Sequence, residues 1–196
     1  MLAAGALIAL HFLIVLSMIG SPDQGRSFIV DHALLRGGTL DQPWRLITSL
    51  FLHGDPTHAF WNGASLLVFS VPLLSQLGYV RTAMIYLASG VGGGLMALKF
   101  ATAGTLIIGS SGAVAGLFGA WVVLTLSRSH LEPLSGRARI RGLGVALLVL
   151  PSLLTPISAT GQAVSVSSHL GGLATGMAIG ALISMGLLRR WAVAAG

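Results

Sequence analysis

One uncharged stretch of the sequence decides the fold class. Residues 100–127 read FATAGTLIIGSSGAVAGLFGAWVVLTLS and contain no Asp, Glu, Lys or Arg. A helix that crosses the hydrocarbon core of a bilayer needs about 20 mostly apolar residues, within a range of about 17–25. The stretch is therefore long enough for one membrane span, and it contains the sequence Gly-Ser-Ser-Gly at 109–112.

The whole chain has a similar composition. Of its 196 residues, 11 are Lys or Arg and 5 are Asp or Glu, so 8% are charged. Soluble domains average about 25%. Hydrophobic residues make up 54%, and the mean hydropathy is +0.88. These values exclude a disordered chain, a nucleic-acid-binding tail and a soluble enzyme, and they indicate a multi-pass membrane protein. Cysteine is absent, which excludes disulfides, a thiolate nucleophile and a cysteine zinc site.

Charged residues divide the chain into uncharged segments long enough for membrane spans. The longest, 142–188, contains two prolines and has room for two spans. We therefore predict an all-α membrane protein, a single domain over residues 1–196 with six transmembrane helices. The predicted spans are 2–20, 58–78, 82–99, 111–128, 141–156 and 168–188. The outer loop 21–57 carries several apolar residues, and we expect it to be partly structured and to lie at the membrane interface.

The distribution of basic residues predicts the orientation of the spans. With the N-terminus inside, 7 of the 11 Lys and Arg residues fall on the inner side, which favours cytoplasmic N- and C-termini. Arg outnumbers Lys ten to one, which suggests a GC-rich bacterial source and hence a bacterial inner membrane. An alternative interpretation of residues 2–20 is a cleaved signal peptide, but no basic segment precedes them and no A-x-A site follows.

Four polar side chains stand near the start of the even-numbered spans. His58 and Asn62 open the second span on one helical face, Ser111 opens the fourth, and His169 opens the sixth. Polar groups inside a bilayer are costly and indicate functional sites. Because the even-numbered spans all begin on the outer side, we expect these four residues to lie at similar depth and to converge.

The residue types at these positions indicate a serine mechanism. A serine becomes a nucleophile when a base takes its proton, and histidine is the usual base. No Asp or Glu lies in any predicted span, which excludes an aspartyl mechanism and an HExxH zinc site. A Ser111–His169 dyad for acyl transfer, in particular peptide hydrolysis, remains. The Ser111 backbone N–H, His58 and Asn62 are candidate donors to the oxyanion.

Glycines spaced every four residues predict which helices approach closely. They occur in the fourth span at Gly112 and Gly116, and in the sixth at Gly172, Gly176 and Gly180. Small residues at this spacing let helix backbones pack closely in lipid. We expect spans four and six to press together and to bring His169 within reach of Ser111, although such glycines also occur in ordinary helix packing. The glycine run at 90–94 is likewise interpreted as close helix packing.

Together these motifs resemble those of the rhomboid intramembrane serine proteases over residues 44 to about 180. The resemblance rests on Trp44-Arg45, His53-x4-His58-x3-Asn62, Gly109-x-Ser111-Gly112 and His169-x2-Gly172-x3-Gly176. It implies a six-helix rhomboid-like bundle in which Ser111 is the nucleophile, His169 is the general base, and His58 and Asn62 serve the oxyanion hole. It also implies a structural role for His53 and a membrane-lying position for Trp44-Arg45. Many family members have an aromatic residue four positions after the serine, where this chain has Ala115.

The resemblance also implies an activity. Rhomboid proteases are serine endopeptidases that cleave single-span membrane proteins within or next to the transmembrane segment, without a metal or cofactor. The expected partners are therefore transmembrane substrates and the lipid bilayer, with no nucleic acid. Two alternatives are a catalytically inactive relative that escorts membrane clients and a small transporter or channel. The first typically lacks the serine or histidine kept here, and the second lacks support from an inverted repeat or intramembrane charges.

Overall fold

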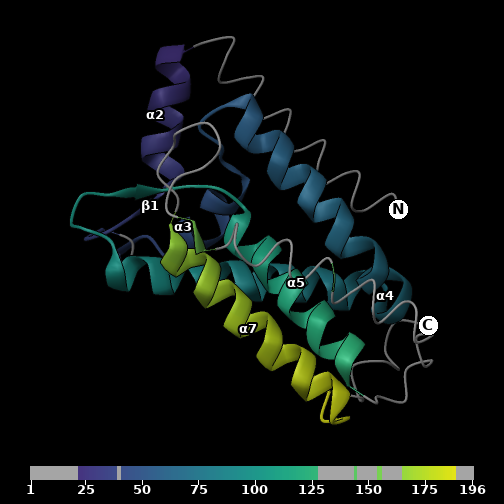
Figure 1. Ribbon diagram of the computed structural model, residues 1–196. Coiled ribbons are helices and arrows are strands. Elements are labelled where there is room, and N and C mark those ends of the chain that lie inside the picture. Colours follow the sequence, from purple (N-terminus) through teal and green to yellow (C-terminus); the bar gives the residue numbers. More distant parts are fainter. Residues whose placement is uncertain (1–21, 39–40, 128–143, 145–153, 156–164, 189–196) are drawn as a thin grey trace.

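A computed structural model describes residues 22–38, 41–127, 144, 154–155 and 165–188 of the chain. The predicted span 2–20 lies outside these residues, as does nearly all of the predicted span 141–156. The other four predicted spans correspond to helices, of which that of the fourth span ends at Leu126 and that of the sixth at Ser184, before the predicted span ends (Figure 1). The elements in chain order are α2 (Pro22–His32), β1 (Leu34–Leu35), α3 (Arg45–Thr48), η2 (Ser49–Phe51), α4 (Pro56–Phe100), β2 (Leu106–Ile107), α5 (Ser111–Leu126) and α7 (Val166–Ser184).

Helix α4 contains the second and third predicted spans, separated by a bend at Gly78. The backbone of Gly78 has φ 76° and ψ 177°, a left-handed φ that glycine adopts without steric cost. The two halves of α4 diverge from this bend (Figure 1). At the other end of the first half, the Asp55 side chain caps the helix by accepting a hydrogen bond from the His58 N–H at 2.9 Å. Pro56 follows at the first helical position, where its missing N–H costs nothing.

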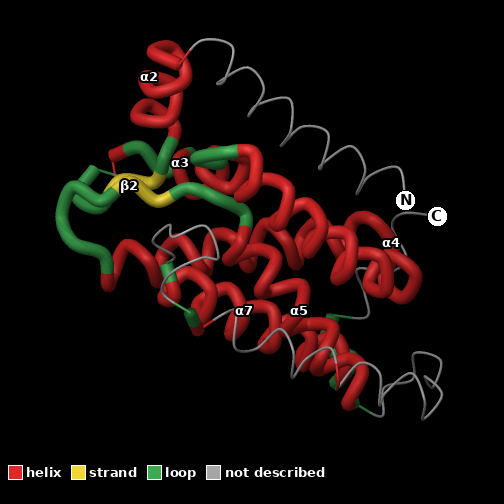
Figure 2. The backbone as a smooth tube through the Cα atoms, turned by 45° about the horizontal axis from the view of Figure 1, so that its top comes forward, coloured by secondary structure: helices red, strands yellow, loops and turns green. Residues whose placement is uncertain are grey.

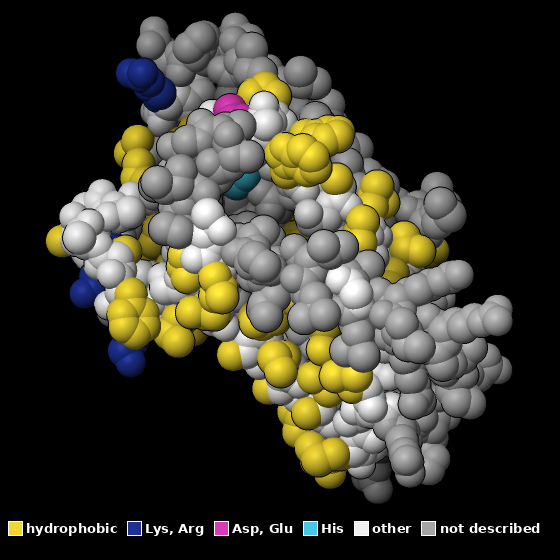
Figure 3. All heavy atoms as spheres, in the orientation of Figure 1, with side chains coloured by type: hydrophobic (Ala, Val, Ile, Leu, Met, Phe, Trp, Pro, Cys, Tyr) yellow, Lys and Arg dark blue, Asp and Glu magenta, His cyan; other side chains and the backbone are white. Residues whose placement is uncertain are grey.

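Helices α5 and α7 correspond to the fourth and sixth predicted spans. The second half of α4 packs against both of them, and the three run together away from the small sheet (Figures 1 and 2). Helices α4 and α7 are long and apolar enough to cross a membrane, while α5, with 16 residues, is shorter. Hydrophobic side chains are spread over the face seen in Figure 3, and the visible Lys and Arg side chains lie at its edge.

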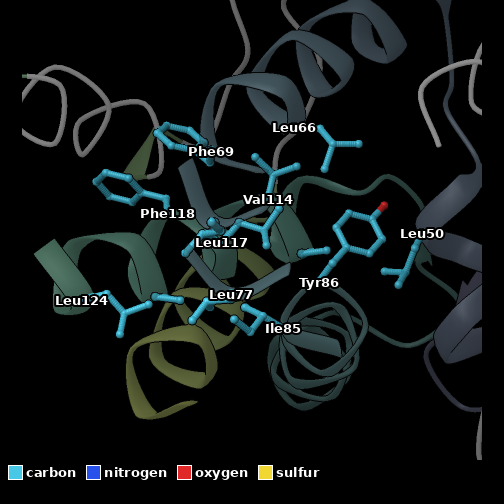
Figure 4. Close-up of a cluster of buried hydrophobic side chains, with 14 residues drawn as sticks. Leu50, Leu66, Phe69, Leu77, Ile85, Tyr86, Val114, Leu117, Phe118 and Leu124 are labelled. Atoms are coloured by element: carbon cyan, nitrogen blue, oxygen red, sulfur yellow. The ribbon is translucent and has the colours of Figure 1, made fainter. Parts of the chain in front are cut away.

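The hydrophobic core lies where the two halves of α4 meet α5. Phe69 and Phe118 pack with their ring centroids 5.1 Å apart (Figure 4). The Trp121 ring lies beside both, with centroids 6.1 Å from Phe69 and 6.4 Å from Phe118. Tyr86 and Leu50 extend this cluster toward η2, with the Tyr86 hydroxyl at its edge. The core therefore fixes the first half of α4, which carries His58 and Asn62, against the helix that begins at Ser111.

The described parts of the predicted outer loop, residues 22–38 and 41–57, contain α2, β1, α3 and η2. A strand pair that the sequence analysis did not anticipate joins them to the bundle. Strand β1 pairs antiparallel with β2, with Leu34 opposite Ile107 and Leu35 opposite Leu106. The Arg36 side chain also donates a hydrogen bond to the Leu98 carbonyl near the end of α4. These bonds fasten the loop to the segment that leads directly into Ser111.

Candidate active site

Ser111 is the first residue of α5, and a sharp turn brings the chain into this position. Gly109 has φ +109° and donates its N–H to the Ser49 carbonyl at 2.9 Å, which ties the turn to η2. Ser110 then occupies the N-cap position and is 1% exposed, whereas Ser111 is partly exposed. Of the two adjacent serines, the Ser111 side chain is therefore the accessible one.

The helix start at Ser111 also offers backbone hydrogen-bond donors. The N–H groups in the first turn of a helix have no partner within the helix, and the helix dipole makes this end electropositive. The Ser110 side chain makes no capping hydrogen bond to them. The N–H of Ser111 is therefore suited to stabilise negative charge on an oxygen next to its own side chain.

His169 lies in the first turns of α7 and is 6% exposed. Its position is fixed by the start of the helix: the His169 N–H donates to the Ser165 carbonyl at 3.2 Å, and the Ser165 hydroxyl accepts from the Ser168 N–H at 3.3 Å. His169 is one helical turn before Gly172 and therefore lies on the same face of α7.

Backbone contacts between α5 and α7 place Ser111 and His169 at the same level. A Cβ atom built on Gly172 would lie 1.9 Å from the carbonyl oxygen of Gly112, and one on Gly176 would lie 1.9 Å from the carbonyl oxygen of Gly116. The two helices are thus parallel and in direct backbone contact. Because Ser111 precedes Gly112 and His169 is one turn before Gly172, both lie where the helices begin. The predicted close approach of spans four and six is confirmed.

His58 lies against the turn that leads into Ser111. A Cβ on Gly109 would lie 2.9 Å from Cε1 and 3.0 Å from Nε2 of the His58 ring, so only glycine fits there. The ring of His53, which is fully buried, packs edge-on against His58 with centroids 4.9 Å apart. His58 therefore packs between the turn that leads into Ser111 and the buried His53 ring.

Asn62 lies one turn below His58 on α4 and is 7% exposed. Its side-chain amide donates to the His58 carbonyl at 3.1 Å. An amide nitrogen carries two hydrogens, so this bond uses one of them. The amide is therefore held beside His58 at the head of α4, as the spacing of the two residues predicts.

The residues of the Trp44-Arg45 pair have different surroundings. Trp44 is 53% exposed, whereas Arg45 is 8% exposed. The Arg45 guanidinium donates to the carbonyls of Val30 at 2.7 Å and Ala33 at 2.8 Å, and also to the Gln42 side chain. Arg45 thus joins the C-terminal part of α2 to α3, a burial that no feature of the sequence indicates.

Sequence analysis also missed the position of Ser168. A Cβ on Gly93 would lie 2.6 Å from the Ser168 carbonyl oxygen, and one on Gly112 would lie 2.6 Å from the Ser168 Oγ. The second half of α4 therefore touches α7 beside His169. The interpretation of the 90–94 glycines as close helix packing is confirmed. Among the residues that the structure describes, no three His, Cys, Asp or Glu side chains gather in a way that would hold a metal ion.

Comparison with known proteins identifies the family of this chain. Residues 40–186 match the family model of the rhomboid domain. This chain belongs to the rhomboid family. The predicted resemblance is thereby confirmed, and the family implies an all-helical integral membrane fold. The described residues do not test the six-helix count, because two predicted spans lie outside them.

Rhomboid relatives occur in plants, bacteria and a protozoan parasite. The chain is 31% identical to RHOMBOID-like protein 6, mitochondrial, of Arabidopsis thaliana, over 74% of this chain and 45% of the relative. It is 30% identical to YdcA of Bacillus subtilis (strain 168), over 76% of this chain and 71% of the relative. It is also 30% identical to Rhomboid-like protease 1 of Toxoplasma gondii, over 72% of this chain and 47% of the relative. The chain thus spans less than half of the plant and parasite proteins.

Proposed function

We propose that this rhomboid is an intramembrane serine endopeptidase with Ser111 as nucleophile and His169 as general base. The observation that carries the proposal is the parallel backbone contact of α5 and α7, which sets the two residues at the same level where both helices begin. The accessibility of Ser111 and the burial of Ser110 support the choice of serine. The Toxoplasma relative is named a protease, which supports the same reaction class.

The reaction follows from the chemistry of these groups. The Ser111 Oγ attacks the carbonyl carbon of the scissile peptide bond while His169 takes its proton. The tetrahedral intermediate collapses, the C–N bond breaks, and the protonated His169 donates its proton to the leaving amine. Water then attacks the Ser111 ester while His169 takes one of its protons. The bond between the acyl carbon and Oγ breaks as His169 returns this proton to Oγ, and the product leaves as a carboxylic acid with Ser111 and His169 restored. No group in this cycle requires a metal or cofactor.

Three donors are assigned to the negative oxygen of the intermediate. The Ser111 N–H is unpartnered within its helix, the His58 ring lies beside the turn at Gly109, and the Asn62 amide donates to the His58 carbonyl with one of its two hydrogens. Preorganised donors of this kind are worth about 10²–10³ in rate each. His53 supports the His58 ring through their edge-on contact and touches no reacting atom in this proposal.

The substrates we propose are single-span membrane proteins cut within or next to their transmembrane segment. The apolar exterior of the described helices requires a bilayer, so a substrate that reaches Ser111 from the same bilayer needs no separate recruitment. We further propose the six-span arrangement with both termini cytoplasmic, in a bacterial inner membrane. The placement of basic residues supports this orientation.

The proposal is tested by cleavage of a panel of single-span substrates by the purified protein in proteoliposomes. Wild type should cleave at least one substrate, and Ser111→Ala and His169→Ala should each abolish cleavage while remaining folded. Ser184→Ala, at the far end of α7, is the matched control and should retain activity. Cleavage by Ser111→Ala at the wild-type rate would contradict the assignment. A wild type that binds these substrates without cutting any would favour the inactive, client-escorting alternative.

A further inference from the structure

A pocket lies between the second half of α4 and the C-terminal part of α7, far from Ser111. It has a volume of about 140 Å³ and is lined by Arg81, Met84, Ile85, Ala88, Ile179, Ile183 and Leu188. Ile183 is 14 positions after His169 on α7, which corresponds to about 21 Å along the helix. The pocket is therefore separate from the candidate active site.

The pocket exists because α4 and α7 approach closely at one end only. Near the active site they touch through small residues, since a Cβ on Gly92 would lie 2.1 Å from the Thr175 hydroxyl and one on Gly171 would lie 2.8 Å from the Gly92 carbonyl oxygen. Toward Arg81 the facing side chains are larger, as at Ile85 and Ile179. Large side chains hold the helices apart there and leave a gap that they do not fill.

The lining of the pocket combines an apolar surface with one cation. Of the lining residues, Arg81 alone is charged or polar. It is partly buried, and the acidic residue nearest to it in the sequence is Asp55, 26 positions away. Among the described residues its side chain forms no hydrogen bond or ion pair. Arginine stays charged at any physiological pH, so this guanidinium is available to bind an anion.

We infer that this pocket binds an anionic phospholipid, with one acyl chain in the apolar gap and the phosphodiester at Arg81. An apolar cavity of about 150 Å³ holds a benzene-sized group, so the gap accommodates a short part of an acyl chain. A guanidinium binds phosphate oxygens through paired N–H groups. Arg81 also follows the bend at Gly78, on the side predicted to carry most of the basic residues, where anionic lipids are attracted.

The lack of cysteine in the chain permits a site-specific test. Leu87→Cys, at a 38% exposed position beside the lining residues, is labelled with a fluorophore that bromine quenches. The protein is placed in phosphatidylcholine bilayers that contain a small fraction of brominated-chain phosphatidylglycerol or, in parallel, brominated-chain phosphatidylcholine. One basic residue is worth about a fivefold preference for an anionic lipid. We expect phosphatidylglycerol to quench Leu87→Cys about five times more effectively than phosphatidylcholine.

Matched variants test whether the preference for phosphatidylglycerol arises at this pocket. Arg81→Gln should bring the two lipids to parity, whereas Arg26→Gln, an exposed arginine on α2, should leave the preference unchanged. Ala88→Phe should fill the gap and reduce quenching by both lipids. A label at Val68→Cys, which is 57% exposed on the first half of α4, should show no preference. Inorganic phosphate should not compete, because it lacks the acyl chain.

Three outcomes would overturn the inference. Equal quenching of Leu87→Cys by both lipids would show that the site does not select a lipid by its charge. A preference for phosphatidylglycerol that persists in Arg81→Gln would show that its phosphodiester does not bind at Arg81. Absence of quenching by either lipid would show that another segment of the chain fills the pocket. None of these results depends on proteolysis, so the inference stands or falls apart from the proposed function.

Discussion

The contact between Gly172 and Gly112 permits a quantitative test of the site. An alanine at position 172 would place its Cβ 1.9 Å from the Gly112 carbonyl oxygen and 2.7 Å from the carbonyl carbon. A carbon and a carbonyl oxygen in contact lie about 3.3–3.6 Å apart, so α5 and α7 must separate by roughly 1.5 Å to accept the methyl group. The displaced backbone is next to Ser111 and one turn after His169.

Such a displacement should affect both activity and stability. A misplacement of about 1 Å between reacting groups can cost about 10²-fold in rate, so Gly172→Ala should lower single-turnover cleavage by about that factor or more. Overpacking typically costs about 1–3 kcal/mol of stability. Helix propensity acts in the opposite direction, because alanine is favoured over glycine by about 1 kcal/mol in a helix interior. A net loss of stability would therefore show that the contact outweighs propensity.

The matched control is Gly180→Ala on the same face of α7. Its Cβ would lie 3.0 Å from the Ala120 carbonyl oxygen, a contact that a shift of a few tenths of an ångström relieves. The Gly180→Ala variant should therefore retain most of the wild-type activity. Single-turnover cleavage in proteoliposomes and thermal unfolding in detergent would be measured for both variants. If Gly172→Ala were as active as wild type and equally or more stable, the close approach of the helices at the site would be wrong.

Three further predictions concern neighbouring groups. Ala115→Tyr should destabilise the protein by about 1–3 kcal/mol in thermal unfolding, because Ala115 is 1% exposed and a tyrosine overpacks the core; unchanged stability would contradict this packing. Asn62→Ala should slow cleavage by about 10²–10³ yet leave more activity than Ser111→Ala, and an unchanged rate would exclude Asn62 from the oxyanion hole. A base accepts a proton only when neutral, so cleavage should fall toward acid pH with the uptake of one proton by His169; a flat single-turnover profile between about pH 4 and 8 would count against the dyad.

The sequence was sufficient to predict the helices that carry the candidate site and the way two of them pack. Asp55 marks the start of α4, and the polar residues Ser111 and His169 mark the starts of α5 and α7, so all three starts fall within two residues of the predicted span starts. Glycines at four-residue spacing identify the faces of α5 and α7 that meet. Both signals are local and periodic, which is why they can be read without a structure.

Other features depend on contacts that have no such pattern. Strands β1 and β2 have two residues each and pair through backbone groups, so no alternation of side chains marks them. Arg45 is buried because carbonyls at the end of α2 accept its hydrogen bonds, although a cation in an outer loop is expected to face water. The sequence analysis assigns Ser111 by its place in the Gly109-x-Ser111-Gly112 motif, but the difference in accessibility depends on the turn at Gly109, which buries Ser110 and leaves Ser111 accessible.

The assignment of Ser111 as nucleophile is tested most directly by covalent labelling. A fluorophosphonate reacts much faster with an activated serine than with an ordinary one and loses fluoride as the Oγ–phosphorus bond forms. Mass spectrometry of the digested protein locates the adduct. We predict one adduct per chain on Ser111, lost in Ser111→Ala and in His169→Ala but retained in Ser184→Ala. An adduct on Ser110, or labelling that persists in Ser111→Ala, would contradict the account.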